Sequence, residues 1–298
     1  MTAPPQIFDR FVVAKHRAQK HAEYGKLFDV SRDNSIQLID RLNDLKKHFS
    51  SALVCNSLNL DTASILKKEH KIENIFISDL SEERTKEALK HGYMTINYDE
   101  EWVPFGHNSF DLIIIEQALH WTNDLPGALI QLKNCLQPDG LFLASLYGGA
   151  SLIELRQALI EAETNIYGGS TPRVSPFIDV KDAGNLALRA GFSLPVADKQ
   201  TVKVEYTNLK ELFTDLKEMG ESNAIKNRFK GLTTPRLFKN TEEHYLKYNS
   251  SDNNKIITTF EIITITGWAP AKNQQKPLKP GSATQRIADA LNTEERNI

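Results

Sequence analysis

The feature that most constrains the fold is the alternation of short apolar runs with amphipathic helical patterns in the first half of the chain. Apolar runs typical of buried strands occupy residues 52–55, 75–78, 94–98, 110–115 and 141–146. Helical patterns separate them at residues 34–49, 63–70, 81–91 and 126–136. Strands that alternate with helices form parallel sheets through right-handed crossovers. The pattern therefore predicts an α/β fold with a doubly wound, mainly parallel sheet.

The second half of the chain is less regular. Helices are predicted at 152–166, 180–190, 209–219 and 242–248, and strands at 201–206 and 256–268. The predicted organisation is an N-terminal segment (1–33), an α/β domain (34–271) and a polar C-terminal tail (272–298). A helical insertion at about 207–250 precedes the last strand of that domain.

Composition excludes several classes of function. The 36 basic and 38 acidic residues nearly cancel, so no basic field is available to bind nucleic acid or an anionic membrane. Cys55 and Cys135 have no second Cys or His at metal spacing, which predicts neither a metal site nor a disulfide framework. No apolar run is long enough for stable membrane insertion, and residues 1–10 lack the apolar core of a signal peptide. We expect a cytoplasmic protein.

Polar residues follow several of the predicted strands, at the edge where parallel sheets bind ligands. Asp79 is placed to accept hydrogen bonds from ribose hydroxyls, and Asp99, beside Tyr98, to accept one from an adenine amine. Glu116 and His120 follow the most apolar strand. Each residue also has a structural interpretation, because an aspartate after a strand is often a turn or capping residue and a loop histidine is often only hydrogen-bonded. Their succession on neighbouring strand ends favours a nucleoside site.

Longer segments carry a family resemblance. They read IFDR, VPFGHNSFDLIIIEQALHWTNDLPGAL, LQPDGLF, YGGASLIELRQAL, SPFIDVKDAGNLALRAGF, DLKEMGESNAIKNR and KPGSATQRIADAL. With these the chain resembles class I S-adenosylmethionine-dependent methyltransferases, in the branch of the methyltransferase-like mitochondrial complex I assembly factor and its alphaproteobacterial homologues. The resemblance implies a Rossmann-like, mainly parallel seven-stranded sheet flanked by helices, with an antiparallel last strand, and S-adenosylmethionine as cofactor.

The segment after the first strand departs from the family pattern. Members carry Asp-Leu-Gly-x-x-x-Gly there, and this chain has no glycine between residues 50 and 70. Counted back from Asp79 without gaps, the family's aspartate falls on Cys55 and its glycines on Ser57, Asn59 and Asp61. The cofactor contacts implied by the resemblance are therefore Cys55, Ser57, Asn59, Asp61, Asp79, Tyr98, Asp99 and Glu116.

These replacements are expected to weaken the cofactor site. Glycine lets the backbone approach a ligand closely, whereas the side chains of Asn59 and Asp61 take up that space even where the residues adopt left-handed geometry. The thiol of Cys55 also removes a carboxylate partner for the cofactor's ammonium group. Each lost charged hydrogen bond costs about 1.5–3 kcal/mol. We expect S-adenosylmethionine to bind weakly or not at all.

Three functions follow from the resemblance. The first is a methyltransferase-like protein that modifies a subunit of respiratory complex I during its maturation, by methylation or by arginine hydroxylation, with His120 or Glu116 orienting or deprotonating the acceptor. The second is a non-catalytic assembly factor that has lost cofactor binding and holds its client through residues 167–177 and 219–228, where Glu221 and Arg228 lie. Either implies a protein partner and no nucleic acid.

The third function is the O-methyltransferase of biotin synthesis, which belongs to a neighbouring branch. That branch needs an intact cofactor loop and a basic patch for a phosphopantetheine carrier. In this sequence Arg156, Arg173 and Arg189 are scattered.

Overall fold

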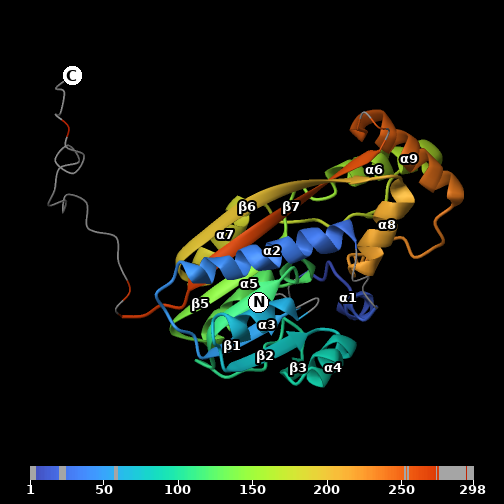
Figure 1. Ribbon diagram of the computed structural model, residues 1–298. Coiled ribbons are helices and arrows are strands. Elements are labelled where there is room, and N and C mark those ends of the chain that lie inside the picture. The colour runs from blue at the N-terminus through green and yellow to red at the C-terminus, as the bar shows by residue number, and fades with distance from the viewer. Residues whose placement is uncertain are drawn as a thin grey trace.

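The computed structural model describes residues 5–19, 25–56, 60–251, 253, 255–272, 274 and 293. Within this part of the chain one sheet has seven strands in the order β3-β2-β1-β4-β5-β7-β6 (Figure 1). The strands are β1 (Ser51–Cys55), β2 (Asn74–Asp79), β3 (Met94–Asn97), β4 (Phe110–Glu116), β5 (Leu136–Tyr147), β6 (Ser193–Tyr206) and β7 (Ile256–Trp268). β1 to β5 pair in parallel, and β7 is antiparallel to both β5 and β6. The predicted fold class is confirmed.

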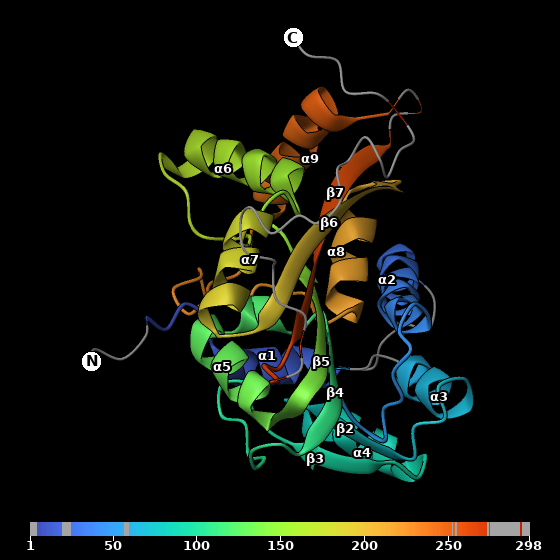
Figure 2. The same ribbon diagram turned by 90° about the vertical axis from the view of Figure 1, so that its left-hand side faces the viewer.

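Helices cover both faces of the sheet. They are α1 (Arg10–Arg17), α2 (Lys26–Asn43), α3 (Asp61–Lys68), α4 (Glu82–Lys90), α5 (Leu125–Cys135), α6 (Ile153–Tyr167), α7 (Val180–Arg189), α8 (Leu209–Glu218) and α9 (Pro235–Asn249). Figure 2 shows α2 and α3 on one face and α5 and α7 on the other.

β4 is a continuous apolar run because helices cover both faces of the sheet at this strand. Leu112 and Ile114 join the core beneath α2 and α3, whereas Ile113 and Ile115 join the core beneath α5 and α7. Successive side chains of a strand point to opposite faces, so a strand covered on both sides needs apolar residues at every position. β4 therefore fixes the centre of the sheet.

A second core forms where β6 and β7 extend beyond the parallel strands. α6, α8 and α9 gather there (Figure 1), and Tyr206 and Tyr245 are fully buried among them. α8 and α9 correspond to the predicted insertion before the last strand. This end of the molecule lies next to the carboxyl end of β5, the edge at which open parallel sheets bind ligands.

Some predicted boundaries differ from the observed ones. α2 begins at Lys26 and ends at Asn43, so the predicted limit between residues 33 and 34 falls inside a helix. α1, capped by the Asp9 side chain, lies in the predicted N-terminal segment and was missed because it is only eight residues long. β6 begins at Ser193, well before residue 201, because this edge strand is largely exposed and lacks a clear apolar alternation. Most of the predicted tail lies outside the described residues.

Within the described ranges, no helix combines the length and the apolar character needed to cross a lipid bilayer.

Candidate functional site

Asp79 at the end of β2 is enclosed by protein groups. Its carboxylate accepts a hydrogen bond from the Ser81 backbone N–H at 2.7 Å and one from Arg84 Nη1 at 3.4 Å, and Arg17 Nη1 lies 3.9 Å away. Its side chain is 2% exposed. The carboxylate predicted to hold a ribose is therefore bound by arginines in this structure.

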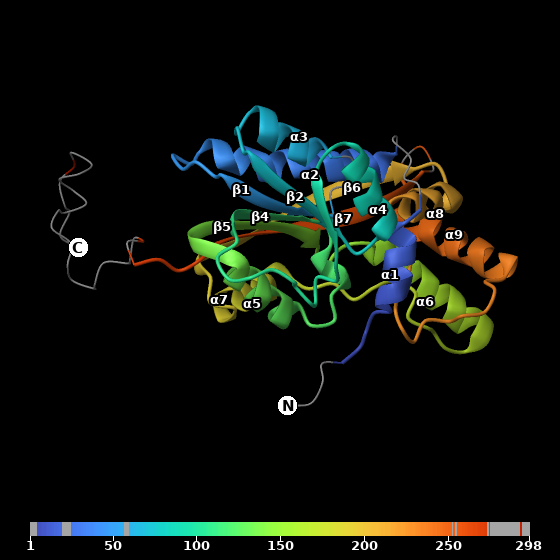
Figure 3. The same ribbon diagram turned by 90° about the horizontal axis from the view of Figure 1, so that it is seen from below.

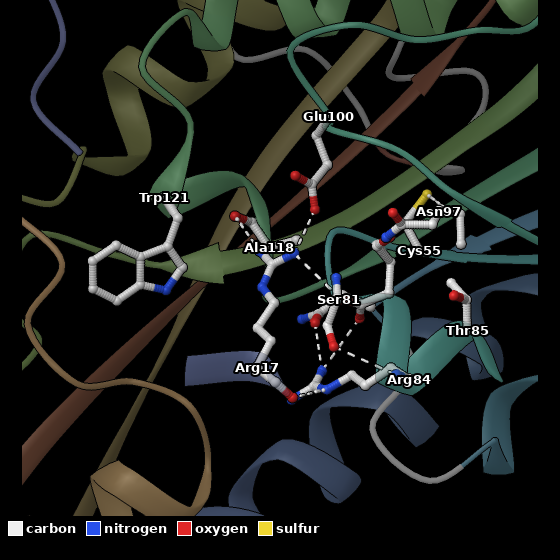
Figure 4. Close-up of polar contacts among 12 residues, drawn as sticks. Arg17, Cys55, Ser81, Arg84, Thr85, Asn97, Glu100, Ala118 and Trp121 are labelled. Carbon is white, nitrogen blue, oxygen red and sulfur yellow. Dashed lines mark hydrogen bonds and ion pairs between the residues drawn. The ribbon is translucent and has the colours of Figure 1, made fainter. Parts of the chain in front are cut away.

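Arg17 of α1 reaches into the strand ends and is itself buried. It donates to Glu100 Oε1 at 2.6 Å and to the Ala118 carbonyl at 3.3 Å (Figure 4). Burial alone would raise the pKa of Glu100, but Arg17 and Arg10 outweigh it and lower the pKa to about 2. The two groups form a charged pair at neutral pH.

Asp99 is held by a second arginine of α1. Arg10 donates from Nε to both carboxylate oxygens at 3.1 Å and from Nη2 to Oδ1 at 2.8 Å, and its Nη1 donates to the Trp121 carbonyl at 3.0 Å. Such a planar fork is the strongest way for a side chain to bind a carboxylate. The predicted adenine partner is thus engaged by a guanidinium.

Asn56 bridges the ends of β1 and β4 at the switch point of the sheet. It adopts a left-handed backbone with φ of 59°. Its amide nitrogen donates to the carbonyls of Glu116 and Gln117, and its oxygen accepts from Arg84 at 2.7 Å. Three hydrogen bonds thus cross the switch point, the place where open α/β sheets bind ligands.

The remaining positions of the predicted loop are only partly described. Ser57 and Asn59 lie outside the described residues. Asp61 is the first residue of α3 and lies 3.5 Å from Arg32 Nε. Its neighbour Leu60 has the left-handed backbone, with φ of 62°.

Cys55 and Tyr98 point into the core and not toward the strand ends. The Cys55 sulfur lies 3.4 Å from the Tyr98 hydroxyl, and Ser78 donates to the sulfur at 3.1 Å. Both side chains belong to the core beneath α5 and α7, so neither is available to a ligand. The prediction that they contact a cofactor is corrected accordingly.

Cys55 is expected to be chemically inert in the folded protein. Burial raises the pKa of its thiol to about 12, although hydrogen bonds with Ser78 and Tyr98 act the other way. Only the thiolate reacts with disulfide reagents. A Cys135→Ser variant, which leaves Cys55 as the remaining cysteine, should show no fast reaction with Ellman's reagent at pH 8 until the chain is unfolded. One fast equivalent in the native state would contradict this placement.

S-adenosylmethionine does not fit among these residues in this conformation. The carboxylates of Asp79 and Asp99 are taken by guanidinium groups, and the Asn56 side chain crosses between the strand ends. A ligand that needs both carboxylates must first displace the arginines.

Glu116 and His120, both predicted to be catalytic, make contacts in different places. Glu116 Oε1 accepts from the Thr62 hydroxyl at 2.5 Å, at the start of α3. His120 lies in a 3-10 helix (Leu119–Trp121), and its Nε2 is 2.9 Å from Glu221 Oε2. Among the described residues, no three His, Cys, Asp or Glu side chains are grouped to hold a metal ion.

Glu221 is fixed by two neighbouring rings. Besides the contact with His120, its Oε2 accepts from Trp121 Nε1 at 3.1 Å. The His120 side chain is 0% exposed and packs edge-on against the Tyr147 ring at 4.9 Å. Among the described residues, no hydrogen bond is made to the second oxygen of Glu221, Oε1. One oxygen is therefore anchored, and the other is available.

Glu221 lines a cavity of about 420 Å³ beside the carboxyl end of β5. Aromatic rings form much of its wall: Trp121, Tyr147, Phe177, Phe213, Phe238 and Phe260. The Tyr147 hydroxyl is buried and has no hydrogen-bond partner in the described part of the chain. Burial, with Glu221 and Asp215 nearby, holds the pKa of this phenol well above its usual range, so it remains a donor at neutral pH.

The cavity was not predicted from the sequence, although two of the segments that line it were predicted to be functional. The two segments predicted as a client surface, 167–177 and 219–228, both contribute to the lining, through Phe177 and Glu221 among others. Their proximity to His120 arises from the tertiary fold and leaves no local pattern in the sequence. Arg173 also lines the cavity, but its charge is paired with Glu163 at 2.6 Å, so it does not form the basic patch that the biotin-synthesis hypothesis needs.

Comparisons with known proteins agree with this architecture. The family model described as "Methyltransferase domain" matches residues 61–144. Arginine-hydroxylase NDUFAF5, mitochondrial, of Rattus norvegicus is 36% identical over 287 residues, covering 95% of this chain and 83% of the relative. The Homo sapiens protein of that name is 35% identical, covering 93% and 81%. Malonyl-acyl-carrier protein O-methyltransferase of Xylella fastidiosa is 27% identical, covering 89% of each.

Solved structures share the fold at low sequence identity. The YcgJ protein of Bacillus subtilis superposes with a TM-score of 0.55 at 14% identity, covering 80% of this chain and 99% of that one. The cyclase SpnF gives a TM-score of 0.51 at 12% identity, covering 91% and 100%.

Proposed function

Since the chain belongs to the class I methyltransferase family, in the branch of arginine-hydroxylase NDUFAF5, we propose that it modifies an arginine side chain of a protein client. The name of these relatives points to hydroxylation, and methylation is the alternative that the fold suggests. The client is a subunit of respiratory complex I in the course of maturation, as the resemblance to the assembly-factor branch implies. The cytoplasmic location expected from the sequence stays a prediction.

The observation that carries the proposal is the Glu221 carboxylate in an aromatic cavity. A guanidinium is planar, always charged and weakly hydrated, and it binds carboxylates while stacking on aromatic rings. Glu221 Oε1 is available to accept from it, and Trp121 and Tyr147 form walls of the same cavity. The volume of about 420 Å³ lies in the range of ordinary ligand pockets.

His120 is a positioning residue in this proposal. It does not line the cavity, but together with Trp121 it anchors Glu221 Oε2 and so sets the direction of Oε1. The Tyr147 hydroxyl has no hydrogen-bond partner in the described protein, and its oxygen can accept from a guanidinium N–H, since arginine has donors and no acceptor. These groups bind and orient the arginine side chain.

Binding of short peptides tests the proposal without a known client. We would titrate the full chain with a capped Gly-Gly-Arg-Gly-Gly peptide and with the same peptide carrying citrulline, which has the shape of arginine and no charge. The arginine peptide should bind at least about tenfold more tightly, because a charge-assisted hydrogen bond with a carboxylate is lost in the other. A lysine peptide is the control for net charge and should bind less tightly than arginine, since an ammonium group cannot stack or form a fork.

Equal affinity for the arginine and citrulline peptides would overturn the proposal. So would a preference for the lysine peptide.

A further inference from the structure

We propose that α1 is a built-in competitor of the family's nucleoside cofactor, and that S-adenosylmethionine binds only after α1 has left the strand ends. The inference concerns the cofactor edge of the sheet, and it does not depend on arginine recognition in the Glu221 cavity. It follows from what α1 contacts, how it is held and what its removal would expose.

The arginines of α1 take the carboxylates that the family pattern assigns to the nucleoside. Arg10 occupies both oxygens of Asp99, and Arg17 lies 3.9 Å from Asp79 while pairing with Glu100 at 2.6 Å. A ribose or an adenine would offer neutral donors to the same oxygens. The carboxylate is charged in both cases, but a guanidinium adds the attraction of an opposite full charge and a planar fork of donors. The docked helix is therefore the stronger occupant.

α1 also contacts the helix that follows β2. It lies beside α4 (Figure 3), and the Arg17 carbonyl accepts from Arg84 Nε at 2.8 Å. Arg84 in turn contacts Asp79 and Asn56. Arg17 and Arg84 thus lie together at the ends of β1 and β2 (Figure 4).

The anchor of α1 is apolar and separate from its ion pairs. Val13 is 1% exposed and packs with Phe8, Trp121, Ala224 and Ile225. Hydrogen bonds from the Asp9 N–H to the Ala224 carbonyl and from the Lys226 N–H to the Ile7 carbonyl hold the preceding residues. A change at Val13 can thus undock the helix without altering any charged group at the carboxylates.

Undocking frees two carboxylates at the strand ends. Asp79 keeps Arg84 and the Ser81 N–H as partners, whereas Asp99 and Glu100 lose both arginines of α1 and gain access to solvent. We call molecules with α1 undocked the open form. For a ligand that binds only this form, the measured affinity is the affinity for the open form multiplied by the fraction of molecules that are open. Raising that fraction should raise the affinity.

The test compares two glutamates on one helix. Val13→Glu places a charge in the apolar anchor, and Phe11→Glu places the same charge at a side chain that is 79% exposed. Affinity for S-adenosylhomocysteine is measured by isothermal titration on full-length protein whose folding is checked by circular dichroism. We expect Val13→Glu to bind at least about tenfold more tightly than wild type, and Phe11→Glu to bind like wild type.

If Val13→Glu does not fold, a second variant can be used in the same titration. Arg10→Ala frees Asp99 while leaving the Arg17–Glu100 pair in place, and it should give a smaller gain in affinity. No gain in any folded variant, or no detectable binding in all of them, would overturn the inference. The arginine and citrulline titrations on wild-type protein judge the proposed function separately, so the two failures are distinguishable.

Discussion

Replacing Arg17 by methionine is expected to lower the free energy of unfolding by about 3 kcal/mol, the lower end of the range for breaking one partner out of a buried ion pair. The Arg17 and Glu100 side chains are 4% and 3% exposed, so the carboxylate cannot turn to water. Arg10 still contacts Glu100, which keeps the loss from being larger. Urea denaturation monitored by circular dichroism measures the change as a shift in midpoint at constant slope.

A surface ion pair provides the control. Lys86 pairs with Glu82 one turn away on α4, with both side chains more than half exposed. Lys86→Met should leave the midpoint within error of wild type, because exposed pairs contribute little. If Arg17→Met were as mild as Lys86→Met, the buried Arg17–Glu100 pair would not contribute to stability as expected.

The same pair gives the wild-type protein a defined response to acid. The pKa of Glu100 in the folded state is lowered to about 2 from an ordinary value of 4.5, so the stabilisation is complete above pH 4.5 and is lost as the pH falls toward 2. In Arg17→Met the pKa of Glu100 should move upward, and this acid-sensitive part of the stability should shrink. Urea midpoints collected along the acid range follow both changes.

Replacing Glu221 by glutamine is expected to weaken binding of the arginine peptide by about tenfold to a hundredfold, the equivalent of one charged hydrogen bond. Glutamine keeps the shape of the side chain, and its carbonyl oxygen can still accept from His120 and Trp121. The folded structure should therefore persist while the negative charge is lost. Isothermal titration measures the affinity, and a thermal melt checks the fold.

Glu243→Gln is the matched control for this change. Glu243 lies on α9, is 63% exposed and contacts Lys239 at 3.9 Å, away from the cavity lining. The Glu243→Gln substitution removes the same charge from the same protein, and it should leave the affinity for the arginine peptide unchanged. A comparable loss in both variants would mean that the net charge, and not the Glu221 site, attracts the peptide.

The parallel sheet could be predicted because its signals are local. The apolar run of β4 and the Ser81 cap of α4 are written in consecutive residues, and the structure has both. The start of β6 could not be predicted in this way, because an exposed edge strand has no buried face to impose alternation. α1 was missed since its helical pattern is only two turns long.

The site was harder to predict because its pairs are distant in sequence. Asp79 and Asp99 could be named from their places after strands, but nothing local shows that arginines from residues 10 and 17 reach them. His120 and Glu221 were each singled out, and their contact joins positions 101 residues apart. Sequence patterns identify which residues carry chemistry at strand ends; the fold decides which of them meet.

A thermodynamic cycle tests most directly the claim that the cavity recognises arginine through Glu221. The affinities of the arginine and citrulline peptides are measured on wild type and on Glu221→Gln, and the two ratios are compared. We predict a ratio of about ten or more in wild type and a ratio close to one in the variant. A preference for arginine that survives intact in Glu221→Gln would contradict the account.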